Sequence, residues 1–284
     1  MRIGEICRKI KYTGRGKNRD TISKYLHEAF ETDIITKPQL TLANHEESTL
    51  YTYLLSCPSK RIEFFEKLKK HPDVFYIVLL DGDFQIFFTS YSSEISMPCR
   101  YMVSPIFTPL YTIPEGWSCS EQQCLMTILS HSYEKGILPR PVYEKLDWEP
   151  LDWQIYDMLK MDLRQSLTKI ARILNISYET IRLHLYKKIL PRTIQSVGFF
   201  PKGLQNYSHL LFLVKTPCEK RFVSALSKLQ TSCLVWPLEN HLLCMVYFQH
   251  LNLFLSVMFN LERKGVFEEY NFLLPLKYEF PDQV

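Results

Sequence analysis

The chain has 284 residues, a length that suits roughly two to four compact domains better than one. Apolar residues make up 46% and charged residues 23% of it, which is the balance of a folded protein and excludes a disordered polar chain. The formal net charge of +4 neither requires nor excludes nucleic acid, because phosphate binding depends on where Lys and Arg cluster.

The cysteines and the apolar segments indicate a cytoplasmic protein. Eight cysteines are scattered and none forms a CxxC, which favours buried, reduced thiols over a disulfide scaffold or a zinc site. The opening "MRIGEICRKIKY" lacks the apolar core of a secretory signal. The most apolar long stretch, 241–261, is interrupted by polar residues and predicts a strand and a buried helix, so no membrane span is expected.

The first elements in chain order form a pattern that returns later. Apolar residues in "IGEICRKI" (3–10) and "DTISKYLHEAF" (20–30) have helical spacing. A β-rich run, a Pro-containing break and a helix follow in 48–68, and then two strands around "DGD" in 74–90. The segment 90–114 is rich in Ser and Pro, and a helix is expected at 119–134.

The second part of the chain repeats these elements in the same order. "LTKIARIL" (167–174) matches the first helix, and "ETIRLHLYKKI" (179–189) matches the second, with Ile181, Leu185 and Ile189 answering Ile22, Leu26 and Phe30. A helix at 152–161 precedes them, and a β-wing at 192–200 follows. Strand, helix, strand, strand, helix (249–263) and strand (271–279) complete the unit.

The predicted fold class is therefore α+β. A winged helix-turn-helix joined to a ferredoxin-like βαββαβ sandwich occurs as a tandem pseudo-repeat, with a trimmed first copy. In the first copy we expect a truncated winged-helix-like segment at 1–47 and an incomplete ferredoxin-like domain at 48–114. A helical linker at 115–150 leads to the second copy. That copy has a complete winged helix-turn-helix at 151–206 and a complete ferredoxin-like domain at 207–284.

The second helix-turn-helix has the residues of a DNA-binding head. Asn175 suits the left-handed end of one helix, and Ser177 suits the cap of the next. If Ile181 and its partners pack inward, polar and aromatic side chains face outward and can meet bases and phosphates in the major groove. The candidate DNA-binding residues in this head are Ser177, Tyr178, Glu179, Arg182, Tyr186, Lys187 and Arg192. The alternative is an exposed amphipathic helix whose charges are merely solvated.

Local charge favours DNA binding at both heads. Six Lys or Arg and one acid lie in 172–202, and eight Lys or Arg lie in the amino-terminal segment against Glu5 and Asp20. In the first head, which is the winged-helix-like segment 1–47, the candidate DNA-binding residues are Arg19 and Lys24.

The second unit resembles the Lrp/AsnC transcription regulators. The resemblance lies in "LDWQIYDMLKMDLRQSLTKIARILNISYETIRLHLYKKIL" and in "PKGL" (201–204) after the wing. It implies a winged helix-turn-helix, a ferredoxin-like effector domain and pairing of two such units. Here both units lie in one chain, which implies an intramolecular pseudo-dimer, with further pairing of chains left open.

The sequence of the hairpin "DGDFQ" (81–85) resembles that of the effector hairpin in the Lrp/AsnC family. By that resemblance, Asp81, Gly82 and Asp83 are candidate contacts for a small, amino-acid-like effector. An Asp-Gly turn is also the ordinary chemistry of a tight hairpin, and this alternative stays open.

Motifs for catalysis are absent from the sequence. The eight histidines form no HExxH and no metal-ligand spacing, and there is no glycine-rich phosphate loop and no GxSxG. We expect no catalytic residue, no metal site and no cofactor, and therefore not an enzyme.

The leading hypothesis is a cytoplasmic, sequence-specific regulator that binds double-stranded DNA through helix 178–189, with a small effector at the sandwich interface. Tandem chains of this architecture also resemble siroheme decarboxylases, an alternative that requires basic and histidine residues inside the sandwich cleft. A non-catalytic protein-interaction module is the third alternative. Operator, effector and the sign of regulation are left open by the sequence.

Overall fold

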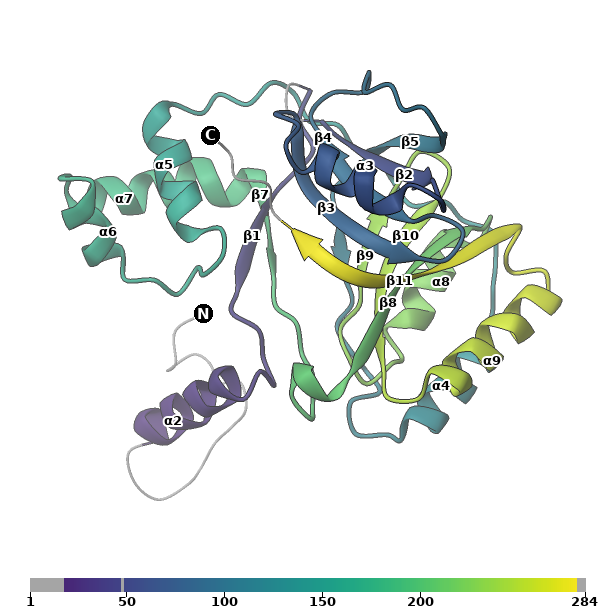
Figure 1. Cartoon of the computed structure of the whole chain (residues 1–284). Helices are drawn as coiled ribbons and strands as arrows, with labels where there is room; N and C mark the ends of the chain where they lie inside the picture. The colour runs from purple at the N-terminus through teal and green to yellow at the C-terminus, as the bar shows by residue number, and fades with distance from the viewer. Residues whose placement is uncertain (1–17, 47–48, 280–284) are drawn as a thin grey trace.

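The computed structural model describes residues 18–46 and 49–279 (Figure 1). Its elements confirm the predicted α+β class, with a helix-turn-helix and ferredoxin-like units in tandem. The elements are α2 (Asn18–Glu31), β1 (Gln39–Leu42), β2 (Leu50–Ser56), α3 (Arg61–Leu68), β3 (Val74–Asp81), β4 (Ile86–Ser90), β5 (Arg100–Ile106), β6 (Leu110–Tyr111), α4 (Glu121–Ser130), α5 (Pro150–Leu159), α6 (Leu167–Ile173), α7 (Tyr178–His184), β7 (Thr193–Ser196), β8 (Ser208–Lys215), α8 (Glu219–Leu226), β9 (Leu234–Pro237), β10 (Leu242–Phe248), α9 (Leu251–Arg263) and β11 (Glu269–Glu279).

The helix-turn-helix forms because its caps and its apolar face agree. Asn175 has a φ of 54°, and the Ser177 hydroxyl accepts a hydrogen bond from the backbone N–H of Thr180 at the start of α7. Ile181 and Ile189 are fully buried against α5 and α6. Both cap predictions are confirmed, but the predicted helix 178–189 is α-helical only to His184 and continues as a wider π turn over Leu185–Ile189.

The strand expected in the wing has a distant partner. β7 pairs antiparallel with β1, with Gln39 opposite Ser196, so it does not form a local hairpin over 192–200. Leu40 of β1 is 4% exposed and packs in the core of α5, α6 and α7. The segment after the first head therefore completes the core of the second, which a pattern search within either unit does not reveal.

The second ferredoxin-like unit has the full βαββαβ order. β8, α8, β9, β10, α9 and β11 follow one another, and the strands lie in the sheet as β11-β8-β10-β9. α8 and α9 cover one face, where Phe212, Phe222 and Phe254 are fully buried. Aromatic and aliphatic side chains at alternate positions of β8 and β10 supply this core.

The first unit has the same strand order without the second helix. β5-β2-β4-β3 repeats the order of the second unit, and α3 covers the face where Tyr53, Phe65 and Phe88 are buried. The Ser- and Pro-rich segment 90–114 supplies β5 and β6. The trimmed first copy is therefore confirmed for the helix, while β5 occupies the place of the last strand.

Each unit sends a strand segment from its C-terminal part to the other unit. β11 pairs with β8 through Glu269–Leu273 and then with β3 of the first unit through Leu274–Glu279. Correspondingly, β5 pairs with β2 of its own unit. β6 follows β5 after three intervening residues and pairs with β9 of the second unit. Among the described strands, nine form one sheet in the order β5-β2-β4-β3-β11-β8-β10-β9-β6.

The two crossings bring the uncovered faces of the half-sheets together. Leu54, Val78 and Phe87 of the first unit and Leu211 and Leu243 of the second unit belong to one buried cluster. The inner faces thus bury each other, while the helices lie outside.

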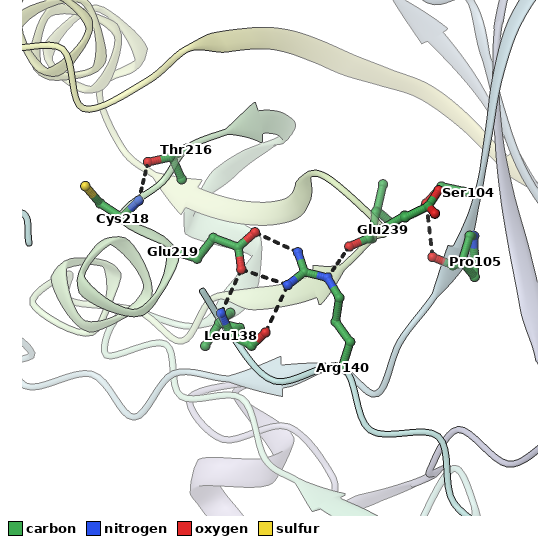
Figure 2. Close-up of polar contacts among 9 residues, drawn as sticks. Ser104, Pro105, Leu138, Arg140, Thr216, Cys218, Glu219 and Glu239 are labelled. Atoms are coloured by element: carbon green, nitrogen blue, oxygen red, sulfur yellow. Dashed lines mark hydrogen bonds and ion pairs between the residues drawn. The ribbon is translucent and has the colours of Figure 1, made fainter. Parts of the chain in front are cut away.

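The segment 115–150, expected to be a helical linker, is packed tightly on the second unit. Leu125 and Ile128 of α4 are buried in the core beneath α8 and α9. Further along, Arg140 makes two contacts with Glu219, at 2.6 Å and 3.0 Å, and donates to the carbonyls of Leu138 and Leu238 (Figure 2). The Glu219 side chain is 3% exposed and also accepts from the Leu138 N–H, so the linker is held by a buried ion pair.

No helix of the described residues has the length and apolar character needed to cross a membrane.

The Arg140–Glu219 pair gives a stability prediction. Glu219→Ala leaves a largely buried guanidinium without its partner and should lower the free energy of unfolding by about 3–5 kcal/mol. Glu134→Ala is the matched control, because it removes the exposed pair of Glu134 with Arg221 and should cost less than about 1 kcal/mol. Urea unfolding of both variants measures the two losses, and equal losses would contradict this assignment.

Candidate functional site

Four polar aromatic side chains gather on the inner face of the sandwich. In β8 and β10 alternate residues point inward, so His209 lies on the same face as the buried Leu211, and Tyr247 lies on that of Leu243. Tyr76 of β3 packs against the same inter-sheet cluster. Tyr278 of β11 joins them where β11 has crossed to the first unit. We call Tyr76, His209, Tyr247 and Tyr278 the polar layer.

The side chains of the polar layer contact one another in a continuous stack. His209 Nε2 is hydrogen-bonded to Tyr278 Oη, and the two rings are stacked with centroids 5.9 Å apart. Tyr278 stacks in turn on Tyr76 at 6.2 Å, and the His209 ring lies 5.5 Å from that of Tyr247. The order is therefore Tyr76, Tyr278, His209, Tyr247, with side chains from both units.

Burial sets the protonation of the polar layer. It lowers the pKa of His209, so that the imidazole is neutral near pH 7. It raises the pKa of Tyr278 to about 12 and also raises the pKa of Tyr76 and of Tyr247, so that the phenols stay protonated. A neutral imidazole joined to a phenol can accept, hold and pass on a proton, which is the requirement for general acid–base chemistry.

A row of hydroxyl groups extends the polar layer across the first half-sheet. Thr89 lies opposite Tyr76, Thr52 opposite Thr89, and Ser104 opposite Thr52. Thr52 is fully buried and Thr89 is 7% exposed, and within the described ranges neither hydroxyl has a hydrogen-bond partner. An unpaired buried hydroxyl costs about 1–3 kcal/mol, so such groups mark places where water or a polar ligand atom belongs.

The pseudo-symmetric position on the other side of the sandwich lacks the histidine of the polar layer. Leu54 and Leu213 occupy equivalent inner positions of β2 and β8, which makes Leu50 the counterpart of His209. By the same reasoning on β4 and β10, Tyr91 is the counterpart of Tyr247. Tyr91 is 56% exposed and lies near Asp157 of α5 and Lys160, which directly follows that helix. Only one of the two positions carries a histidine.

The predicted DNA-binding residues of the second head are exposed, except for Arg192. Tyr178 is 44% exposed, Tyr186 is 60% exposed, and Lys187 is also exposed. Arg182 forms an exposed ion pair with Glu179 at 3.4 Å. The side chains of His184 and Lys188 turn inward towards the Asp152 carboxylate. His184 Nδ1 lies 2.7 Å from one of its oxygens, and Lys188 Nζ lies 3.6 Å from the other. Ser177 serves as a helix cap, and Arg192 is half-buried in the turn after the π segment.

The first head is described only in part. Lys24 is exposed on α2, and Arg19 lies in the first turn of that helix. The predicted helix at 3–10 lies outside the described residues. DNA contact by either head remains a prediction.

The predicted effector hairpin lies at the opposite end of β3 from the polar layer. Asp81 lies five positions after Tyr76, which corresponds to about 16 Å along a strand. Gly82 has a φ of +131°, and a Cβ there would lie 2.6 Å from the Phe272 carbonyl oxygen, so glycine is required where the hairpin touches β11. Asp81 pairs with Arg61 at 3.4 Å, and Asp83 is exposed. Effector binding at 81–83 stays a prediction.

Among the described residues, no group of three or more His, Cys, Asp or Glu side chains is placed to hold a metal ion.

Comparison with known proteins gives similar solved structures but no family. No protein family and no curated protein matches the sequence. The chain is similar to two crystal structures of the siroheme decarboxylase NirDL, one of them in co-complex with an iron-uroporphyrin III analogue. Both are 11% identical, with 97% of this chain and 85% of the other covered, and the TM-scores are 0.49 and 0.46.

One prediction from the sequence is overturned by this comparison. The chain was expected not to be an enzyme, because its architecture resembled that of regulators and its sequence held no catalytic motif. Both similar structures are those of a decarboxylase, which contradicts that prediction.

Sequence reasoning missed the polar layer. The signal was present in the alternation "HLLFL" of β8 and "LCMVY" of β10, in which His209 and Tyr247 have the parity of inward leucines. Tyr76 and Tyr278 carry no comparable signal, because they approach His209 only through the crossing of β11 to β3.

Titration of His209 tests the electrostatics of the polar layer. Because burial lowers the folded-state pKa, NMR should show its imidazole titrating below the ordinary value of about 6.5. The unfolded chain then binds more protons as pH falls through that range, so this group's contribution to stability, present above pH 6.5, is lost on further acidification. His209→Gln should flatten that part of the stability profile. Titration of His209 at or above the ordinary value would contradict the assignment.

Proposed function

We propose that this chain is an enzyme whose reaction centre is the polar layer, where His209 and Tyr278 transfer a proton to or from a planar, carboxylated organic substrate. The observation that carries the proposal is a neutral imidazole, hydrogen-bonded to a phenol, at one of two pseudo-symmetric positions while the other has Leu50. A leucine would satisfy packing alone, so the histidine and its tyrosine partners need another explanation.

The polar layer suggests the class of substrate. Tyr76 and Tyr247 stand at the two ends of the stack, where a conjugated ring can be added to it. A protonated phenol is a donor for a carboxylate oxygen, and Tyr247 Oη can exchange its 3.0 Å contact with Met245 Sδ for such a partner. The siroheme-decarboxylase alternative required histidine inside the sandwich, and His209 meets that condition. Its requirement for basic residues is not met by the polar layer itself, where protonated phenols are the donors.

Decarboxylation is a reaction that such a group of side chains can serve. The carbon–carbon bond to the carboxyl group breaks, carbon dioxide leaves, and the remaining carbon takes up a proton. The hydrogen shared between His209 Nε2 and Tyr278 Oη can be held next to that carbon and replaced from solvent, because His209 is half-buried and Tyr278 is 38% exposed.

The experiment uses siroheme and iron-uroporphyrin III as probes. Wild-type protein should shift the absorbance of the bound ring and release carbon dioxide, detected by loss of carboxyl mass from the product. His209→Leu, which copies the counterpart Leu50, should reduce turnover by about 100-fold or more, as expected for loss of an acid–base group. Circular dichroism should remain unchanged.

Tyr91→Phe is the matched control for Tyr247→Phe, since the two tyrosines are pseudo-symmetric counterparts. Tyr247→Phe should weaken ring binding and Tyr91→Phe should not. The proposal fails if wild-type protein neither binds nor converts the probes, or if the two tyrosine variants behave alike.

DNA binding is the second candidate function. The specific observation in its favour is that Tyr178, Arg182, Tyr186 and Lys187 lie exposed on or directly after the capped helix α7. In this alternative the predicted effector would act at the 81–83 hairpin.

Mobility shift at low salt tests the DNA-binding alternative. Arg182→Ala combined with Lys187→Ala should weaken binding, and a bidentate base contact by Arg182 alone is worth about 1–3 kcal/mol. Lys215→Ala, at the end of β8, is the control and should leave binding unchanged. Absence of binding, or equal loss in the control, would exclude this alternative.

A further inference from the structure

Two cysteines of the first unit face each other at the ends of neighbouring strands. β2 pairs antiparallel with β5, and the last pair in register is Ser56 with Arg100. The next residue outward on each side is Cys57 after β2 and Cys99 before β5. Cys57 is 5% exposed in the core beneath α3, and Cys99 is half-buried and packs against the same cluster.

The geometry of opposed strands suits a bond between the two side chains. Directly opposed residues of antiparallel strands have Cα atoms about 4.5–5.5 Å apart, within the range of about 4.4–6.8 Å for disulfides. Each thiol affects the pKa of the other, which agrees with the two side chains lying close together.

The backbone at Cys57 is fixed, while Cys99 is the more accessible group. The Cys57 N–H donates to the Gln85 side chain at 2.7 Å, and Gln85 donates to the Gly82 carbonyl at 2.6 Å. An oxidant from solvent therefore reaches Cys99 first, and the buried Cys57 is placed to react with the oxidised Cys99 afterwards.

We propose that Cys57 and Cys99 form an oxidisable dithiol that takes a low-molecular-weight disulfide as its oxidant and closes to an intramolecular disulfide. The site lies away from the polar layer and does not depend on the proposed function.

The reaction balances with glutathione disulfide as the oxidant. The Cys99 thiolate attacks one sulfur, the glutathione disulfide bond breaks, and one glutathione leaves as a thiolate. Cys57, after losing its proton, attacks the Cys99 sulfur of the mixed disulfide and releases the second glutathione. Two protein thiols are oxidised, one glutathione disulfide is reduced to two glutathione thiols, and the protons from the cysteines pass to the leaving thiolates.

Burial of the two thiols governs the rate of their oxidation. It raises the pKa of Cys57 to about 11 and also raises the pKa of Cys99, so the thiolate fraction near pH 7 is small. Oxidation should accordingly be slow at neutral pH and accelerate as pH rises towards the pKa of these thiols.

Cys119 and Cys124 are the competing pair. Their thiols also interact, but Cys119 is exposed just before α4, and the Cys124 Sγ contacts the Gly116 carbonyl oxygen at 3.4 Å. They lie five residues apart at the start of a helix, without the opposed strands that align Cys57 with Cys99.

The test is incubation of the full chain with glutathione disulfide at neutral and alkaline pH, followed by non-reducing peptide mapping. The expected product has lost two hydrogen atoms and joins the Cys57 and Cys99 peptides, with faster formation at the higher pH. Because the bond closes a long loop, the oxidised protein should have a raised Tm.

Two variants separate this site from the alternatives. Cys57→Ser should trap a persistent glutathione adduct on Cys99, whereas Cys119→Ser should leave the Cys57–Cys99 product unchanged. A lasting glutathione adduct in the wild type, a bond between Cys119 and Cys124 in its place, or absence of any bond at alkaline pH would overturn the proposal.

Discussion

The crossing of β11 from one unit to the other is the constraint on which the structure depends. Its first half completes the sheet of β8, and its second half pairs with β3 of the first unit. β5 and β6 make the reciprocal crossing to β9. With both crossings in place, the inner faces of the half-sheets bury Leu54, Val78, Leu211 and their neighbours, which neither unit can do alone. The ribbon of β1 and β7 links the units a second time, since Leu40 completes the core of the helix-turn-helix.

The same crossing assembles the polar layer. Tyr278 reaches Tyr76 and His209 only because β11 has left its own unit, so the polar layer belongs to both copies of the repeat. Duplication within one chain also lets the two pseudo-symmetric positions differ. One carries His209 and Tyr247, while the other has Leu50 and an exposed Tyr91 that lies near α5. Two identical subunits would have to carry the same residues at both positions.

Much of the fold was predictable from the sequence because its signals are local. The repeat, the cap at Ser177, the left-handed Asn175 and the βαββαβ order follow from spacing within short segments, and the structure confirms them. The β1–β7 pairing, the crossing of β11 and the packing of α4 on the second core depend on contacts between distant segments, which periodicity does not encode. The polar layer was predictable only in part. The alternation of β8 and β10 predicts that His209 and Tyr247 face inward, but the sequence does not predict that they lie close to Tyr76 and Tyr278.

The central claim is that one polar layer between the two units is where the substrate binds. A crystal structure of the chain with iron-uroporphyrin III tests it most directly. The account predicts one ring per chain, lying against Tyr76, His209 and Tyr247, with a carboxylate within hydrogen-bond reach of a phenol. A ring over Leu50 and Tyr91, a ring outside the sandwich, or crystals that take up no ring would contradict it.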